Sequence, residues 1–283
     1  MTQPQSRATE EVLIEAGRSM RHYWLDLWRY RELFAFLAWR DLAVRYKQTA
    51  IGVAWGVLRP LLIMIVFTLV FGSLAGLDDE TPGAAPYAIV VFAALLPWQF
   101  FAGALADSSA SLVDNANMIS KVYFPRLTMP VSSVIVNLAD LAISFGLLVV
   151  LMLVLQHPPS IRLLALPPLV ALAISAALGA GIWMAALNVK YRDFRYIVPF
   201  IVQLGLYVSP VGFPSSVVPD QWRLLYSLNP MVGVIDGFRW AILGPPAEIY
   251  WPGFVLSLVL TVIILTLGIA YFRRTERTFA DVI

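Results

Sequence analysis

The sequence predicts an all-α integral membrane protein with six transmembrane helices, and three observations favour this fold class. Hydrophobic residues make up 59% of the 283 positions and charged residues only 13%, whereas a soluble domain carries roughly 25% charged residues. So much apolar surface does not fit one water-soluble core, because single cores stop growing at roughly 250–300 residues. Six apolar stretches can each cross a membrane core of roughly 30 Å as a helix.

The predicted spans have about the 20 residues that a crossing helix needs. They are Val53–Leu77, Pro86–Ala106, Met129–Leu155, Leu163–Val189, Tyr196–Phe213 and Pro252–Phe272. The fifth is the shortest and ends in SPVGFP (209–214), which cannot continue as a regular helix. Pro60 lies early in the first span and Pro97 in the middle of the second, where we expect a helix break that turns the Trp98 ring inward.

The distribution of Lys and Arg predicts that both termini are cytoplasmic, because these residues are retained on that side of the membrane. With the N-terminus inside, 17 of the 20 Lys and Arg residues lie inside, and only Arg162, Arg223 and Arg239 lie outside. The first twenty residues contain no apolar stretch typical of a signal peptide. We therefore divide the chain into a polar tail (1–21), an amphipathic interface helix (22–50) and a six-span membrane domain (51–283).

The predicted interface helix is dense in aromatic residues and carries Leu27, Tyr30, Phe34 and Leu37 at steps of three and four. Arg29 and Arg40 fall elsewhere around the helix. This pattern is typical of a helix lying in the membrane interface with its apolar face toward the lipid. The alternative is a helix packed on a soluble partner.

A short inner loop, 111–128, mixes Met118, Val122, Tyr123 and Phe124 with polar residues. A short amphipathic helix that docks in a groove of another protein uses such apolar side chains. The alternative is that the loop packs against the ends of its own helices.

The outer stretch 214–251 contains two apolar patches that are too short to cross, Gln221–Leu228 and Met231–Leu243, so we expect re-entrant or surface half-helices. Asn229 can cap the second, and Pro230 fits its first turn. Asp236 and Arg239 then lie three residues apart on one helix face and can pair. We interpret these four residues as an outer gate; the alternative is that the Arg239 side chain extends to the lipid headgroups.

Residues that carry catalysis or bind metals are sparse. The sequence has no GxxxxGK[ST] phosphate loop, no GxSxG elbow and no cysteine. Its two histidines, His22 and His157, fall on opposite sides of the predicted membrane, so we expect no metal site. Asp140 is the one acid well inside a predicted span, with Asn137 one turn before it. An intramembrane carboxylate is a functional hypothesis by default; here we favour a bond to a neighbouring helix over a proton relay.

Five motifs, in order, resemble ABC-transporter permeases that export polysaccharides. They are RYKQTAIGVAWGVLRPL, LLPWQFFAGAL, NANMISKVYFPRLTMP, NVKYRDFRYIVPF and SLNPMVGVIDGFRWAIL, and the resemblance covers the chain from about Arg31 onward. That family exports O-antigen, capsular polysaccharide and teichoic acid across the bacterial cytoplasmic (inner) membrane. The resemblance does not separate these substrates.

The resemblance implies a permease homodimer working with two copies of a separate ATPase, which would bind the ATP and Mg²⁺. This chain would then hold no cofactor and carry no enzymatic activity. The inner loop would be the coupling helix seated on that ATPase, with coupling residues Asn117, Met118, Lys121, Tyr123, Phe124 and Arg126. The outer half-helices would correspond to the family's periplasmic gate helices.

An aromatic-lined tunnel suits a sliding polysaccharide, because ring faces hold sugars loosely and conduction requires weak sites. The predicted channel residues are Trp98, Phe100, Phe101, Tyr196, Phe200 and Tyr207; packing between helices or contact with lipid is the alternative for each.

Two other functions remain open: a permease of the same type that exports a small lipid or drug, and an ion-coupled secondary transporter. The second predicts internal repeats and more intramembrane carboxylates than Asp140.

Overall fold

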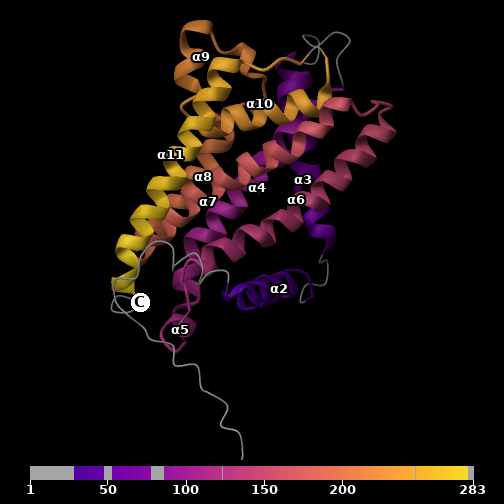
Figure 1. Cartoon of the computed structure of the whole chain (residues 1–283). Helices are drawn as coiled ribbons and strands as arrows, with labels where there is room; N and C mark the ends of the chain where they lie inside the picture. Colours follow the sequence, from indigo (N-terminus) through magenta and orange to yellow (C-terminus); the bar gives the residue numbers. More distant parts are fainter. Residues whose placement is uncertain (1–28, 48–52, 78–85, 123, 246, 280–283) are drawn as a thin grey trace, which may run out of the picture.

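The computed structural model describes residues 29–47, 53–77, 86–122, 124–245 and 247–279, and within these ranges it contains helices and no β-strand (Figure 1). The prediction of an all-α fold is therefore confirmed for the described part of the chain. The α-helices are α2 (Arg31–Lys47), α3 (Val53–Phe67), α4 (Tyr87–Asp114), α5 (Ala116–Ile119), α6 (Thr128–Val154), α7 (Leu166–Lys190), α8 (Phe194–Val208), α9 (Asp220–Tyr226), α10 (Pro230–Leu243) and α11 (Trp251–Thr275).

Five helical segments within the described ranges are long and apolar enough to cross a membrane. They are Ala54–Leu74, Tyr87–Asp114, Thr128–Val154, Ile161–Lys190 and Trp251–Thr278, and they match the first four predicted spans and the sixth. Helix α8 covers the fifth predicted span with only 15 residues, about 22 Å at 1.5 Å per residue. It ends at Val208 because Ser209 adopts an extended backbone before Pro210.

The short helices mark the two ends of the bundle. Helix α2 lies crosswise to the long helices at one end, where α5 and the end of α11 also lie, whereas α9 lies at the opposite end (Figure 1). We refer to these as the α2 end and the α9 end.

Helix α4 is the centre of the bundle and contacts α3, α6, α7, α8 and α10. Most of its side chains from Tyr87 to Trp98 are buried. The predicted break at Pro97 is wrong, because α4 runs unbroken from Tyr87 to Asp114. Proline removes one backbone hydrogen bond, and the helices around a membrane helix allow it to tolerate that loss.

Helices α7 and α11 meet through small residues. Gly268 of α11 and Gly179 of α7 are both buried. A Cβ atom added at Gly268 would lie 2.4 Å from the carbonyl oxygen of Gly179 in α7. The two backbones are therefore in direct contact, as in membrane helix pairs that associate through small residues.

The predicted outer half-helices differ sharply in burial. The structure has α9 and α10 in that stretch, and no residue of α9 is buried. In contrast, α10 packs against α4, α7 and α11 and buries Met231, Val234, Ile235 and Phe238. Helix α10 is thus part of the hydrophobic core.

Helix α2 confirms a helix within the predicted range 22–50, but its apolar face packs on the protein. Leu37 is buried, and Tyr30 and Leu33 pack beside it against an apolar cluster that includes Leu112 and Ile119. Phe36 and Trp39 lie exposed on α2. The prediction that the Tyr30–Leu37 face meets lipid is therefore wrong for these residues, and Leu27 lies outside the described ranges.

Candidate functional site

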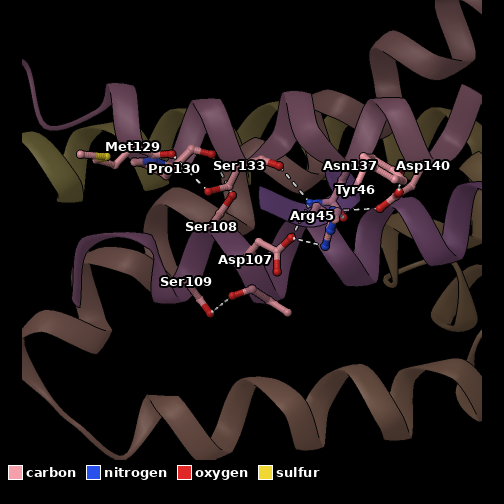
Figure 2. Close-up of polar contacts among 11 residues, drawn as sticks. Arg45, Tyr46, Asp107, Ser108, Ser109, Met129, Pro130, Ser133, Asn137 and Asp140 are labelled. Atoms are coloured by element: carbon pink, nitrogen blue, oxygen red, sulfur yellow. Dashed lines mark hydrogen bonds and ion pairs between the residues drawn. The ribbon is translucent and has the colours of Figure 1, made fainter. Parts of the chain in front are cut away.

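A polar cluster joins α2 to α4 and α6 near the α2 end, and Figure 2 shows its side chains converging between these helices. Arg45 of α2 lies between two carboxylates. Its Nη2 is 3.0 Å from Oδ2 of Asp107 in α4, and its Nη1 is 2.8 Å from Oδ2 of Asp140 in α6. One guanidinium thus bridges two membrane-spanning helices.

Asn137 and Tyr46 complete this cluster, which we call the polar cluster (Arg45, Tyr46, Asp107, Asn137 and Asp140). The Asn137 side-chain amide donates to Asp107 Oδ2 at 2.8 Å and to the Ser133 carbonyl at 2.9 Å. The Tyr46 hydroxyl donates to Asp140 Oδ1. Gly103 makes room for the Asn137 side chain, because a Cβ at position 103 would lie 2.3 Å from Asn137 Oδ1.

The charges of the polar cluster do not balance, since one guanidinium faces two carboxylates. All three charged side chains are partly exposed. Burial, and then the hydrogen bond and negative charge of Asp140, raise the pKa of the Tyr46 hydroxyl, so it remains a donor at neutral pH. The arrangement fixes α2 to α4 and α6 through charge and hydrogen bonds.

Sequence reasoning found part of this cluster. It singled out Asp140 and Asn137 and favoured a bond to a neighbouring helix, which the contacts of Asp140 with Arg45 and Tyr46 confirm. It missed Asp107, which follows directly after the predicted second span. It also missed the role of Arg45, which counted only as a cytoplasmic charge.

The segment predicted to couple to an ATPase lies at the α2 end and includes the single-turn helix α5. Asn117 and Lys121 are exposed, whereas Met118 is partly buried. Phe124 is only 5% exposed and packs in the apolar cluster with Leu37, so it is not available as a docking side chain and that prediction is wrong.

Arg126 also contacts its own chain, through the Glu276 carbonyl and the ring of Phe279. Tyr123 lies outside the described ranges. The sequence pattern gave no sign that the end of α11 would occupy this side of the loop.

The six predicted channel residues separate into two groups. On α4, Trp98 and Phe100 are buried within this chain, and Phe101 packs beside Trp98 with ring centroids 5.8 Å apart. On α8, Tyr196, Phe200 and Tyr207 are 79%, 64% and 61% exposed. Packing between helices thus accounts for the α4 aromatics, and the α8 aromatics form an open surface.

Trp98 is held in place by the close approach of α8. A Cβ at Gly205 would lie 2.5 Å from Trp98 Cη2. We therefore expect Gly205→Ala to displace the ring and to lower the free energy of unfolding by about 1–3 kcal/mol, the usual cost of overpacking. The melting temperature of the purified protein should fall accordingly.

The double variant Gly205→Ala with Trp98→Phe should recover most of this loss, because the smaller ring leaves room for the added methyl group. Gly146→Ala is the matched control, since nothing lies within 4 Å of a Cβ there. Equal melting temperatures for Gly205→Ala and wild type would show that α8 does not press on Trp98.

At the α9 end, the structure confirms the predicted helix cap at Asn229 and the predicted place of Pro230. Asn229 caps α10 by accepting a hydrogen bond from the Met231 amide at 3.0 Å, and Pro230 occupies the first turn. The Asn229 amide also donates to Ser209 Oγ at 2.9 Å, in the segment that follows α8.

Asp236 and Arg239 attract each other electrostatically, but they do not form the direct ion pair that the sequence predicted. Arg239 is 5% exposed, and its guanidinium donates to the carbonyls of Val90, Val211 and Phe213. No ion pair joins Arg239 to Asp236 within the described ranges. A guanidinium has five N–H donors, and Arg239 directs three of them to carbonyls, one in α4 and two in the segment that follows α8.

The sequence matches a known protein family over most of its length. The family described as "ABC-2 type transporter" matches residues 32–243. This range contains the polar cluster, the α8 aromatics and all four predicted gate residues.

Curated relatives extend this likeness. The O-antigen export system permease protein RfbA of Myxococcus xanthus is 29% identical over 216 residues, covering 76% of this chain and 81% of that protein. An RfbA of Klebsiella pneumoniae is 27% identical over 259 residues, covering 89% of this chain and 95% of the relative. The polysialic acid transport protein KpsM of Escherichia coli is 20% identical over 249 residues, covering 84% and 91%.

Proposed function

This chain belongs to the ABC-2 type transporter family, and we propose that it is the membrane permease subunit of an ATP-driven exporter of lipid-linked polysaccharide. The observation that carries this proposal is its similarity, over most of both chains, to permeases named for O-antigen export and to one named for polysialic acid transport. Those names share one substrate class, a long carbohydrate polymer.

The exposed face of α8 supports a path for such a polymer. Tyr196, Phe200 and Tyr207 present their rings outward, and aromatic faces hold the CH faces of sugars without fixing their register. One copy leaves this surface open. We therefore propose that two copies of the chain face each other and enclose the path.

A separate ATPase is the proposed source of energy, binding the ATP and Mg²⁺. Its proposed docking site is the α2 end, where Asn117 and Lys121 near α5 are exposed beside Met118. Because Phe124 is buried and Arg126 is bound to Glu276, these two residues would shape the docking segment from within.

The proposed orientation puts the α2 end in the cytoplasm and the α9 end outside. The excess of Lys and Arg in the inner segments supports it. If α8 is counted as a short span, the chain crosses six times, and both termini then lie on the cytoplasmic side of a bacterial inner membrane. Helix α2 would lie at that surface with Phe36 and Trp39 toward the headgroups.

Deletion of the gene from its host tests this function. Surface polysaccharide should disappear, and lipid-linked polymer should accumulate inside the cell, because its synthesis continues without an exit. Both effects should be reversed by a plasmid copy of the gene. Unchanged surface polysaccharide would contradict the proposal and would favour the export of a small amphiphile.

A further inference from the structure

The segment between α8 and α9 poses a hydrogen-bonding problem that two side chains solve. Residues 209–214 follow the end of α8 and do not form a helix. Ser209 and Val211 are buried, so the backbone carbonyls here have little access to water. In an apolar environment each unpaired carbonyl destabilises the structure.

Three consecutive carbonyls of this segment accept hydrogen bonds from side chains of other helices. Arg239 of α10 donates from Nη2 to the Val211 carbonyl and from Nη1 to the Phe213 carbonyl, both at 2.8 Å. Tyr87 of α4 donates from its hydroxyl to the Gly212 carbonyl between them. We call this arrangement the carbonyl clamp.

Packing holds the same segment from another side. A Cβ at Gly212 would lie 2.6 Å from two ring atoms of Phe71, so the absence of a side chain lets the backbone approach this ring. Arg239 also donates from Nε to the Val90 carbonyl of α4 at 3.3 Å. The clamp therefore ties the end of α8 to α4 and α10, the most deeply buried helices.

Helix α8 also contacts α4 and α7, and Tyr207 stacks on Phe67 of α3, but the helix buries little of its surface. Val198 is its one buried residue, among 15 that are all described, and Gly205 packs against Trp98 of α4. Its aromatic face is open along most of its length. The carbonyl clamp thus adds hydrogen bonds at the α9 end of a helix that buries little elsewhere.

We propose that Arg239 and Tyr87 are positioning residues for export, which fix the α9 end of α8 so that the helix moves about this point. The proposal rests on the proposed function, because α8 carries the suggested polymer path. Neither side chain need touch the substrate; both act through the backbone of 211–213. Lysine at 239 would keep the charge but not the planar fork that reaches two carbonyls at once.

The first test measures how accessible the segment 211–213 is to a thiol reagent, and it needs no export assay. The chain has no cysteine, so Val211→Cys provides a single reporter at a buried position. In purified protein, a water-soluble maleimide should label it slowly. Adding Arg239→Met or Tyr87→Phe should speed labelling about tenfold, since each loses buried hydrogen bonds, and Arg239→Lys should give an intermediate rate.

Arg223→Met is the matched control. Arg223 lies on α9 at the same end and contacts Asp220 and the Tyr250 ring; no carbonyl of 211–213 accepts from it in the described structure. Labelling should stay at the wild-type rate. If the labelling rate is also unchanged in Arg239→Met and Tyr87→Phe, then these side chains do not hold the segment 211–213, and the clamp is ruled out.

The second test uses the deletion strain. Tyr87→Phe and Arg239→Lys, made in the cysteine-free chain, should lower surface polysaccharide at least about fivefold at equal amounts of permease in the membrane. Faster labelling with normal export would overturn the positioning role. If the wild-type gene itself fails to restore polysaccharide, the proposed function fails, and the labelling result still decides the clamp.

Discussion

Replacing Gly268 with valine is expected to prevent the chain from folding into a stable bundle. The Gly268 Cα faces the backbone of α7, and a Cβ would lie 2.4 Å from the Gly179 carbonyl oxygen. A flexible side chain can move away from such a contact, but a helix backbone cannot. Valine adds three carbon atoms at this point, so α7 and α11 must separate.

The same crossing is tight from the side of α7. A Cβ at Gly179 would lie 2.7 Å from the backbone nitrogen and Cα of Leu265. Membrane helices associate largely through van der Waals contact between closely approaching backbones. Separating α7 from α11 would therefore weaken the packing between these two helices along their length. We expect the loss of stability to lie at or above the upper end of the roughly 1–3 kcal/mol that overpacking costs.

The measurement is the fraction of monodisperse protein in detergent and its melting temperature. Gly146→Val in α6 is the matched control, because it makes the same change in a long membrane helix where nothing lies within 4 Å of a Cβ. We expect aggregation for Gly268→Val and near wild-type behaviour for Gly146→Val. Similar losses in both variants would mean that helix propensity, and not the α7–α11 contact, sets the effect.

Hydropathy predicted five of the six spans well because a membrane helix must satisfy its own backbone, so length and apolarity suffice. The end of the second span was harder to predict. Asp107, Ser108 and Ser109 lower the local hydropathy, yet α4 continues through them. Ser109 and Ser111 donate to helix carbonyls three residues earlier, and Ser108 donates to the Pro130 carbonyl of α6, so these hydroxyls need no water.

Contacts between distant segments were beyond the sequence pattern. The spacing of Asp236 and Arg239 fits a pair on one helix, but Arg239 faces carbonyls of a different segment. Phe124 has the composition of a docking residue, but the end of α11 covers it, with Phe272 and Phe279 in the same apolar cluster. Periodicity gives the face on which a side chain lies, and tertiary packing decides what meets that face.

Replacing Arg45 with methionine is expected to release α2 from the bundle. Arg45 is the cation that Asp107 and Asp140 share, and its removal leaves two carboxylates between α4 and α6. All three side chains are partly exposed, so each ion pair alone contributes only about 1 kcal/mol or less. The larger effect comes from the carboxylates left without a partner and from the Tyr46 contact that depends on the same docking.

Neutral partners should restore the docking. In Arg45→Met combined with Asp107→Asn and Asp140→Asn, no charge remains unpaired, and Tyr46 can still donate to the side-chain oxygen at position 140. We therefore expect the triple variant to be closer to wild type than Arg45→Met alone. This order of effects distinguishes a charge requirement from a simple loss of contacts, which would make the triple variant the worst.

Hydrogen exchange of the α2 amides, 31–47, in lipid nanodiscs measures the docking directly. Exchange should be fastest in Arg45→Met and slower again in the triple variant. Lys47→Met is the control on the same helix, because Lys47 lies over the Trp39 ring and has no carboxylate partner within the described ranges. If Arg45→Met and Lys47→Met exchange alike, then apolar contacts such as that of Leu37 hold α2, and the polar cluster does not.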